Sequence, residues 1–132
     1  MERRRYLPTV AQLIDRLSIV TLKSIKIPEH KAEYEKEATD IMHDLGDNGS
    51  LYRAIQINAI CNLVIWLNEA EARKGGDSQD FLLKFTHSVN GVRTAAMNAI
   101  SKILGERQDL KVDCLASDVC KLNGYDFTEI LD

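Results

Sequence analysis

The stretch LYRAIQINAICNLVIWLNEAEARK, residues 51–74, decides the fold. Its first twenty residues are apolar on nearly every side of a helix, and such a helix is normally surrounded by protein rather than placed on a surface. One set of residues falls into a line at helical spacing: Asn58, Asn62, Trp66, Glu69 and Arg73. The sequence therefore predicts a long central core helix with one polar and aromatic line along it.

Helical periodicity extends through most of the chain. Apolar residues recur every three to four positions over four segments, which are 9–27, 29–45, 51–74 and 78–104. Short connections bring consecutive helices side by side in opposite directions. The sequence predicts an all-α fold, an antiparallel four-helix bundle, in which residues 1–132 form a single domain.

Local signals mark the ends of these helices. A capping box begins at Thr9, and Gly46 follows the last apolar residue of the second segment. We expect residues 47–49 to form a turn and Ser50 to cap the central helix. Gly91 does not disturb the apolar phase of the fourth segment, so a continuous helix is predicted there at a cost of about 1 kcal/mol, with a kink at this position as the alternative.

The signal is weaker after residue 104. Leu115, Val119 and Leu122 have the spacing of a short C-terminal helix, which Gly124 would end. Further apolar residues follow, and they either dock on the bundle or belong to a partner surface: Tyr125, Phe127, Ile130 and Leu131.

The lengths of the helices predict an interface. At 1.5 Å per residue the third and fourth helices run roughly 36 and 40 Å, whereas the first two are nearer 25 Å. Part of the long pair is then uncovered in a monomer, and exposed apolar surface of that size usually marks an interface. We therefore expect a homo-oligomer, a homodimer built on the long helices.

Composition favours one ordinary globular domain. Of the 132 residues 45% are hydrophobic and 28% are charged. The apolar run of the central helix is about 14 residues long and contains asparagines, whereas a membrane span needs about 20. With no secretory signal visible, we expect no membrane association and a cytoplasmic location. Cys61, Cys114 and Cys120 lack zinc-site spacing, so we expect reduced structural cysteines.

Charge is distributed unevenly along the chain. Residues 1–31 carry seven Lys or Arg and three Asp or Glu, whereas the rest carry ten and seventeen. Phosphate contacts are driven by positive charge, and this body is acidic with no basic helix face. Nucleic-acid binding is therefore an unlikely function.

Two elements carry a resemblance to known proteins. Residues 13–23 read LIDRLSIVTLK, and residues 62–73 read NLVIWLNEAEAR. The chain resembles a loose group of uncharacterised bacterial and phage helical proteins, which show a Leu-Ile/Val-Asp-Arg/Lys-Leu-Ser helix and later an Asn, Trp, Glu and Arg helix. The resemblance implies an all-α fold and a possible phage origin, and no activity.

The chain is also similar in type to the all-α nucleotide pyrophosphohydrolases, which are oligomeric and magnesium-dependent. Those enzymes carry Glu-x-x-Glu on one helix and Glu-x-x-Asp on the next, which aims paired oxygens at a hard cation. Here Glu37 and Asp40 form half of that pattern, and Glu33 and Glu69 are the remaining candidates. The competing interpretation is that the acidic stripe of the second helix, which consists of Glu33, Glu37, Asp40 and Asp44, is a solvated helix face.

The polar line of the central helix is the main candidate binding site. Asp15 borders the apolar face of the first helix, and it would pair with Arg73, Glu69 or the asparagines. A buried carboxylate or amide needs such a partner. The set Asp15, Asn58, Asn62, Trp66, Glu69 and Arg73 is therefore either a small-ligand site or a network that fixes helix register. The Trp66 side chain is expected in the core, with a stacking platform as the alternative.

No constellation for nucleophilic catalysis and no phosphate loop are visible. We therefore predict a dimeric protein-interaction or structural module that needs no cofactor. The alternative is a divergent Mg-dependent nucleotide pyrophosphohydrolase that uses Glu33, Glu37, Asp40 and Glu69.

Overall fold

The structure is a computed structural model that describes residues 6–76, 79–107, 121–122 and 124–130. Its helices are α1 (Val10–Lys26), α2 (Lys31–Leu45), α3 (Gly49–Arg73) and α4 (Gln79–Leu104). Two short strands follow, β1 (Lys121–Leu122) and β2 (Tyr125–Asp126), paired antiparallel. The predicted all-α class is confirmed, and the four helices start and end close to the predicted residues.

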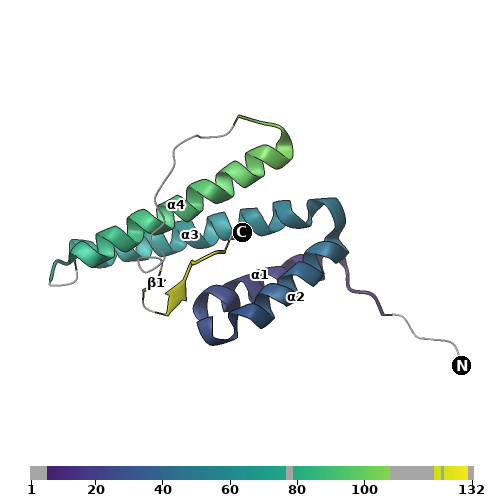
Figure 1. Cartoon of the computed structure of the whole chain (residues 1–132), viewed down its shortest axis with the longest axis horizontal. Coiled ribbons are helices and arrows are strands. Elements are labelled where there is room, and N and C mark those ends of the chain that lie inside the picture. Colours follow the sequence, from purple (N-terminus) through teal and green to yellow (C-terminus); the bar gives the residue numbers. More distant parts are fainter. Residues whose placement is uncertain (1–5, 77–78, 108–120, 123, 131–132) are drawn as a thin grey trace, which may run out of the picture.

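The helices form two pairs rather than a closed bundle. α4 packs along α3, α1 packs along α2, and the two pairs meet through smaller contacts of α3 with α1 and α2. Figure 1 shows the α3–α4 pair beside the shorter α1–α2 pair, with the C-terminal segment between them. The predicted four-helix bundle is not confirmed, because the extensive contacts of α4 are with α3 alone.

The core is divided in the same way. The larger cluster joins α3 and α4 to the end of α1 and to the C-terminal segment, and its buried members are Ile25, Ile57, Cys61, Val64, Phe85, Val89, Val92, Ala96, Phe127 and Ile130. The smaller cluster holds α1 against α2 and consists of Leu17, Val20, Ala38 and Ile41. The buried residues of α1, α2 and α4 recur at the helical spacing that the sequence showed, whereas the sequence did not indicate which side of α3 would be buried.

Two local predictions about the helices are confirmed. The Thr9 Oγ1 atom accepts from the Gln12 amide at 3.1 Å, and the Gln12 Oε1 atom accepts from the Thr9 amide at 2.8 Å, so the capping box is complete. α4 continues through Gly91, which is buried.

The connection between α2 and α3 differs from the prediction. Gly46–Asn48 forms a short 3₁₀ turn, and α3 already begins at Gly49, with no side-chain cap at its start. Ser50 is therefore not the cap. A Cβ atom on Gly49 would lie 2.3 Å from the main-chain oxygen of Met42. The tight approach of the two helices at this corner requires a glycine.

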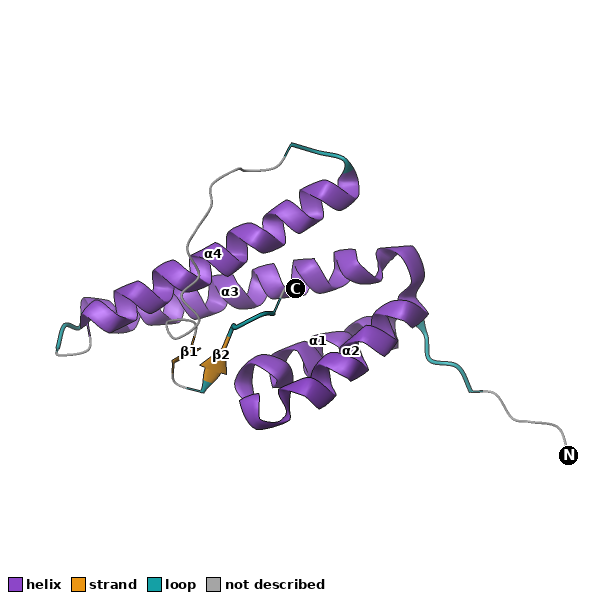
Figure 2. Ribbon diagram, viewed as in Figure 1, coloured by secondary structure: helices purple, strands orange, loops and turns teal. Residues whose placement is uncertain are grey.

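The C-terminal segment, residues 124–130, closes the larger core. Leu122 lies in β1, so it does not belong to the predicted short helix, and residues 115–120 of that prediction lie outside the described residues. Phe127 and Ile130 are buried against the α3–α4 pair, and the Phe127 ring lies 6.4 Å from that of Phe85. Of the two alternatives for this apolar tail, Phe127 and Ile130 dock on the helices. Figure 2 shows the segment that carries them running between the two helical pairs.

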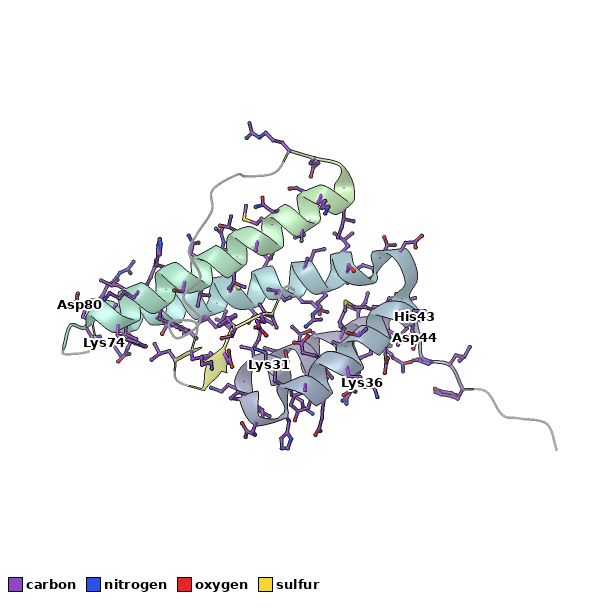
Figure 3. All side chains as sticks on the ribbon, viewed as in Figure 1. Lys31, Lys36, His43, Asp44, Lys74 and Asp80 are labelled. Atoms are coloured by element: carbon purple, nitrogen blue, oxygen red, sulfur yellow. The ribbon has the colours of Figure 1, made fainter. Side chains whose placement is uncertain are left out.

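A polar anchor ties the C-terminal segment to the start of α2. The Lys31 ammonium donates to the Thr128 carbonyl oxygen and lies 3.4 Å from the Asp126 carboxylate, and Figure 3 labels Lys31 at this end of α2. The Asp126 Oδ1 atom accepts from the Thr128 amide at 2.8 Å. Burial by itself raises the pKa of Asp126, but hydrogen bonds from Thr128 and the charges of Lys31 and Lys121 outweigh it. The net effect lowers that pKa below its ordinary value of 3.8.

Polar contacts also hold the α1–α2 pair on α3. The buried Arg53 guanidinium lies 2.5 Å from the Glu35 carboxylate of α2, and the Gln56 side chain donates to the Ile14 carbonyl oxygen of α1 at 2.9 Å. All of these contacts involve the first half of α3. The second half of α3 therefore extends beyond the shorter pair.

Candidate functional site

The predicted line on α3 is only partly covered by the described residues, since Asn58 and Glu69 are half-buried and the other three members are exposed. α1 and α2 contain 17 and 15 residues against 25 in α3, so they end before the second half of α3 does. Trp66 is 69% exposed, and Asn62 and Arg73 are also exposed. The predictions that Trp66 lies in the core and that this helix is surrounded by protein are therefore wrong within a single chain. For Trp66 the physical reason is the length mismatch that the sequence already showed, because the second half of α3 extends beyond the shorter pair.

The middle of the line is a hydrogen-bonded network. The Asn62 amide donates to the Asn58 Oδ1 atom at 3.3 Å, and the Asn62 Oδ1 atom accepts from the Arg93 Nε group of α4 at 2.7 Å. Arg93 also donates to the Asn90 Oδ1 atom at 3.4 Å. The asparagines are hydrogen-bonded, although Asn62 is exposed rather than buried as expected, and the network links α3 to α4 at the surface.

Arg93 was missed by sequence reasoning. It lies beside Val92, a member of the apolar stripe of α4, and it looked like an ordinary solvated cation. The available signal was its place midway along α4. In an antiparallel pair that position lies opposite the middle of α3, where Asn62 lies.

The end of the line is a shallow polar pocket. Glu69 and Arg73 lie 4.0 Å apart and are largely exposed, so their ion pair contributes little to stability. Together with Ala72, Gln79 and Leu83 they line a pocket of about 260 Å³ between the end of α3 and the start of α4. This pocket is open to solvent, and its two charged lining residues, Glu69 and Arg73, pair with each other.

Asp15 is not part of this arrangement. Its side chain is exposed on α1, and within the described residues it forms no ion pair or hydrogen bond with Glu69, Arg73 or the asparagines. The neighbouring Arg16 is the residue that pairs, with Glu37 of α2 at 2.6 Å. The structure therefore separates Asp15 from the rest of the candidate set.

The four carboxylates of the metal hypothesis are not brought together as its ligand set. Glu37 is paired with Arg16, Glu33 lies 3.8 Å from His30, and Asp40 is exposed on α2. Glu69 is paired with Arg73 far along α3. Among the residues that the structure describes, no three His, Cys, Asp or Glu side chains gather in a way that would hold a metal ion. The geometry gives the hydrolase alternative no support.

The uncovered surface is chiefly apolar. We call it the open face, and it consists of Ile55, Ala59, Leu63, Trp66, Leu67 and Ala70 on α3. Leu63 and Leu67 are 51% and 50% exposed, and Ile55 is 48% exposed. The Asn62–Arg93 network runs along one side of the open face. Large side chains on an apolar helix face with a polar border are typical of a binding surface rather than of a reaction centre.

Composition alone would also allow this region to enter a membrane. The helical stretch Pro28–Arg73 contains a window that is long and apolar enough to cross one, and core helices of other proteins meet the same criterion. Only 28% of that window is buried in the structure. The exposed apolar residues of this window are the feature that a functional proposal has to explain.

Comparison of the chain with protein-family models, with curated proteins and with solved structures finds no match. The open face, and not a likeness to another protein, is therefore the basis for a function.

Proposed function

We propose that the protein is a homodimeric helical module in which two copies pair through their open faces. The observation that carries this proposal is the exposure of Trp66, Leu63 and Leu67 on one continuous helix face. Monomeric proteins rarely leave a contiguous apolar patch of this kind in water. Tryptophan is also the residue type most enriched among those that dominate binding energy at interfaces.

A second copy fits the layout of the open face. In a two-fold symmetric dimer the same patch of each copy contacts the other copy. A residue on one side of the axis therefore contacts a residue from the other side of the axis in the second copy. With the axis near Asn62, Trp66 of one copy meets the region of Ile55 and Ala59 on the other. The small Ala59 leaves room for the indole ring, and two α3–α4 pairs would together form the four-helix bundle that one chain does not form.

The expected affinity is moderate. The open face spans 16 residues, so at 1.5 Å per residue and a helix width of about 10 Å it covers roughly 240 Å² per copy. The adjoining edge of α4 would about double this footprint. Stable interfaces bury about 800 Å² per partner, so we expect a reversible dimer in the micromolar range.

The first test is the mass of the protein in solution over a wide range of concentration. Analytical ultracentrifugation from about 1 to 100 µM should show a concentration-dependent shift from the chain mass of 14.9 kDa to twice that value. Trp66→Glu places a charge at the centre of the open face and should leave only the monomer. Because the side chain is mostly exposed, the fold of each copy should tolerate this change.

The matched control is Val10→Glu, which adds the same charge at another exposed apolar position, on α1 and away from the open face. It should dimerise like the unchanged protein. A monomer at every concentration, or equal dimerisation of the Trp66→Glu variant, would contradict the proposal. A monomer that instead binds phospholipid vesicles through Trp66 would replace the dimer with membrane association.

A further inference from the structure

The dipeptide Asn-Gly occurs twice within the described part of the chain, in two different surroundings. Asn48–Gly49 lies at the corner between α2 and α3, and Asn90–Gly91 lies in the middle of α4. A third copy, Asn123–Gly124, begins at a residue outside the described ones. An asparagine that precedes glycine can react with its own backbone, because glycine has no side chain to shield its amide nitrogen. The two described copies differ in how easily that amide is freed.

The copy at the corner lies at a helix end. Asn48 is exposed and is the last residue of the short 3₁₀ turn, and its side chain makes no capping hydrogen bond to α3. α3 begins at Gly49, whose amide donates to the Gly46 carbonyl oxygen across that turn. The end of a helix opens at a lower free-energy cost than its middle, so a local opening at this corner frees the Gly49 amide.

The copy in α4 is enclosed by regular structure. Gly91 is buried, and its neighbours Val89 and Val92 belong to the larger core cluster. The Asn90 Oδ1 atom also accepts from Arg93 at 3.4 Å. Freeing the Gly91 amide therefore requires unfolding of the middle of α4 and loss of its core contacts, which costs more than opening a helix end.

We propose that Asn48 is a site of spontaneous deamidation in the folded protein and that Asn90 is protected from it. The Gly49 amide nitrogen gives up its proton to hydroxide and attacks the side-chain carbonyl carbon of Asn48. The side-chain nitrogen takes a proton from water and leaves as ammonia, and a five-membered succinimide ring remains. Water then opens this ring at either of its two carbonyl groups, which gives aspartate or isoaspartate at position 48. No oxidant or reductant takes part.

The fold itself keeps a glycine beside this asparagine. A Cβ atom on Gly49 would lie 2.3 Å from the Met42 main-chain oxygen, so the corner excludes the larger residues that would slow the reaction. The two products have different effects at this corner. Aspartate leaves the main chain unchanged and adds a negative charge at the start of α3, which favours a helix. Isoaspartate lengthens the main chain by one atom directly before Gly49, so the close approach to Met42 has to change.

The test is ageing of the full chain in mildly alkaline buffer, followed by peptide mapping with mass spectrometry. The peptide that contains Asn48 should rise in mass by the difference between water and ammonia. Its rate should be at least about tenfold that of the peptide that contains Asn90. In guanidinium chloride the two rates should become similar, because both asparagines precede glycine and only the fold separates them. Peptide mapping reports Asn123 separately.

Two variants at Asn48 separate the chemistry from its consequence. Asn48→Gln keeps a side-chain amide, but its cyclisation would form a six-membered ring, so this position should stay unmodified over the same time. Asn48→Asp carries the charge of one product on an unchanged main chain, and it should resist urea at least as well as the unchanged protein. The isoaspartate form, separated by ion exchange, should unfold at a lower urea concentration. Asn90→Gln is the matched control, and it should deamidate at Asn48 like the unchanged protein.

Equal rates at the two asparagines in the folded protein would overturn the proposal. A reaction at Asn48 that occurs only in denaturant would also overturn it. An isoaspartate form as stable as Asn48→Asp would refute the effect assigned to the corner. Asn48 does not belong to the open face, so Trp66→Glu should deamidate like the unchanged protein. Failure of this proposal is therefore distinguishable from failure of the dimer.

Discussion

Gly49 shows how much a single position can decide in this molecule. Its backbone is helical, so an alanine would adopt the conformation without strain, but a Cβ atom would lie 2.3 Å from the Met42 oxygen. The main chain of α2 or α3 has to move to relieve that contact. We expect Gly49→Ala to lower the free energy of unfolding by about 3 kcal/mol, which urea denaturation measures.

Ser50 provides the matched control for this prediction. It is the next residue, it is exposed, and it makes no capping hydrogen bond. Ser50→Ala should therefore change stability by less than about 0.5 kcal/mol. A loss in Ser50→Ala as large as that in Gly49→Ala would show that the start of α3 depends on a cap after all.

At the scale of single residues, the sequence predicted which residues share a helix face, but it did not predict which of them are exposed. The line from Asn58 to Arg73 follows from helix geometry. The cost of an unpaired buried amide does not explain its hydrogen bonds, because Asn62 is exposed. The exposure of Trp66 does not follow from helix geometry, because apolar residues all round a helix look the same whether the neighbour belongs to the same chain or is absent. The contact of Arg93 with Asn62 depends on the packing of α4 against α3, which the sequence alone does not show.

At the scale of elements, the C-terminal segment provides a pH-dependent contact. The pKa of Asp126 is lowered in the folded protein, so its charged form stabilises the fold at pH values above the ordinary value of 3.8. That contribution is lost as the pH falls from this value through the lowered pKa. Asp126→Asn keeps an acceptor for the Thr128 amide and removes the charge opposite Lys31. We expect it to cost about 1–2 kcal/mol at pH 7.

Urea denaturation between about pH 2 and pH 7 measures this effect. The loss of stability in acid should be smaller in Asp126→Asn than in the unchanged protein. Asp40→Asn is the control, since Asp40 is exposed on α2 and should behave like the unchanged protein. Identical acid profiles of the unchanged protein and Asp126→Asn would refute the role assigned to this carboxylate.

The elements themselves were largely predictable, and their packing was not. Capping residues, glycines and apolar phase located all four helices, including the continuous α4 through Gly91. The two-residue strands were not predictable, because Leu122 and Tyr125 pair over a distance too short to show an alternating pattern. The lengths of the helices correctly indicated that part of the long pair would be uncovered.

At the scale of the whole molecule, the proposed dimer links stability to concentration. Whatever binds only the folded state raises the unfolding temperature by mass action, and here the second copy plays that role. For a chain of this size we expect a rise of about 3 °C for each tenfold increase in concentration above the dissociation constant. Calorimetry should show this rise for the unchanged protein and none for Trp66→Glu. A constant midpoint in the unchanged protein would exclude a dimer that stabilises the fold.

The anchor between Lys31 and Thr128 joins residues 97 positions apart in the chain. The α1–α2 and α3–α4 pairs need only neighbouring segments to meet, and such local contacts form early in folding. Docking of Phe127 comes later, because it requires closure of a loop that contains most of the chain. Closing such a long loop costs conformational entropy. The order of assembly thus follows from the connectivity: both helical hairpins come first, and the side chain that completes the larger core arrives last.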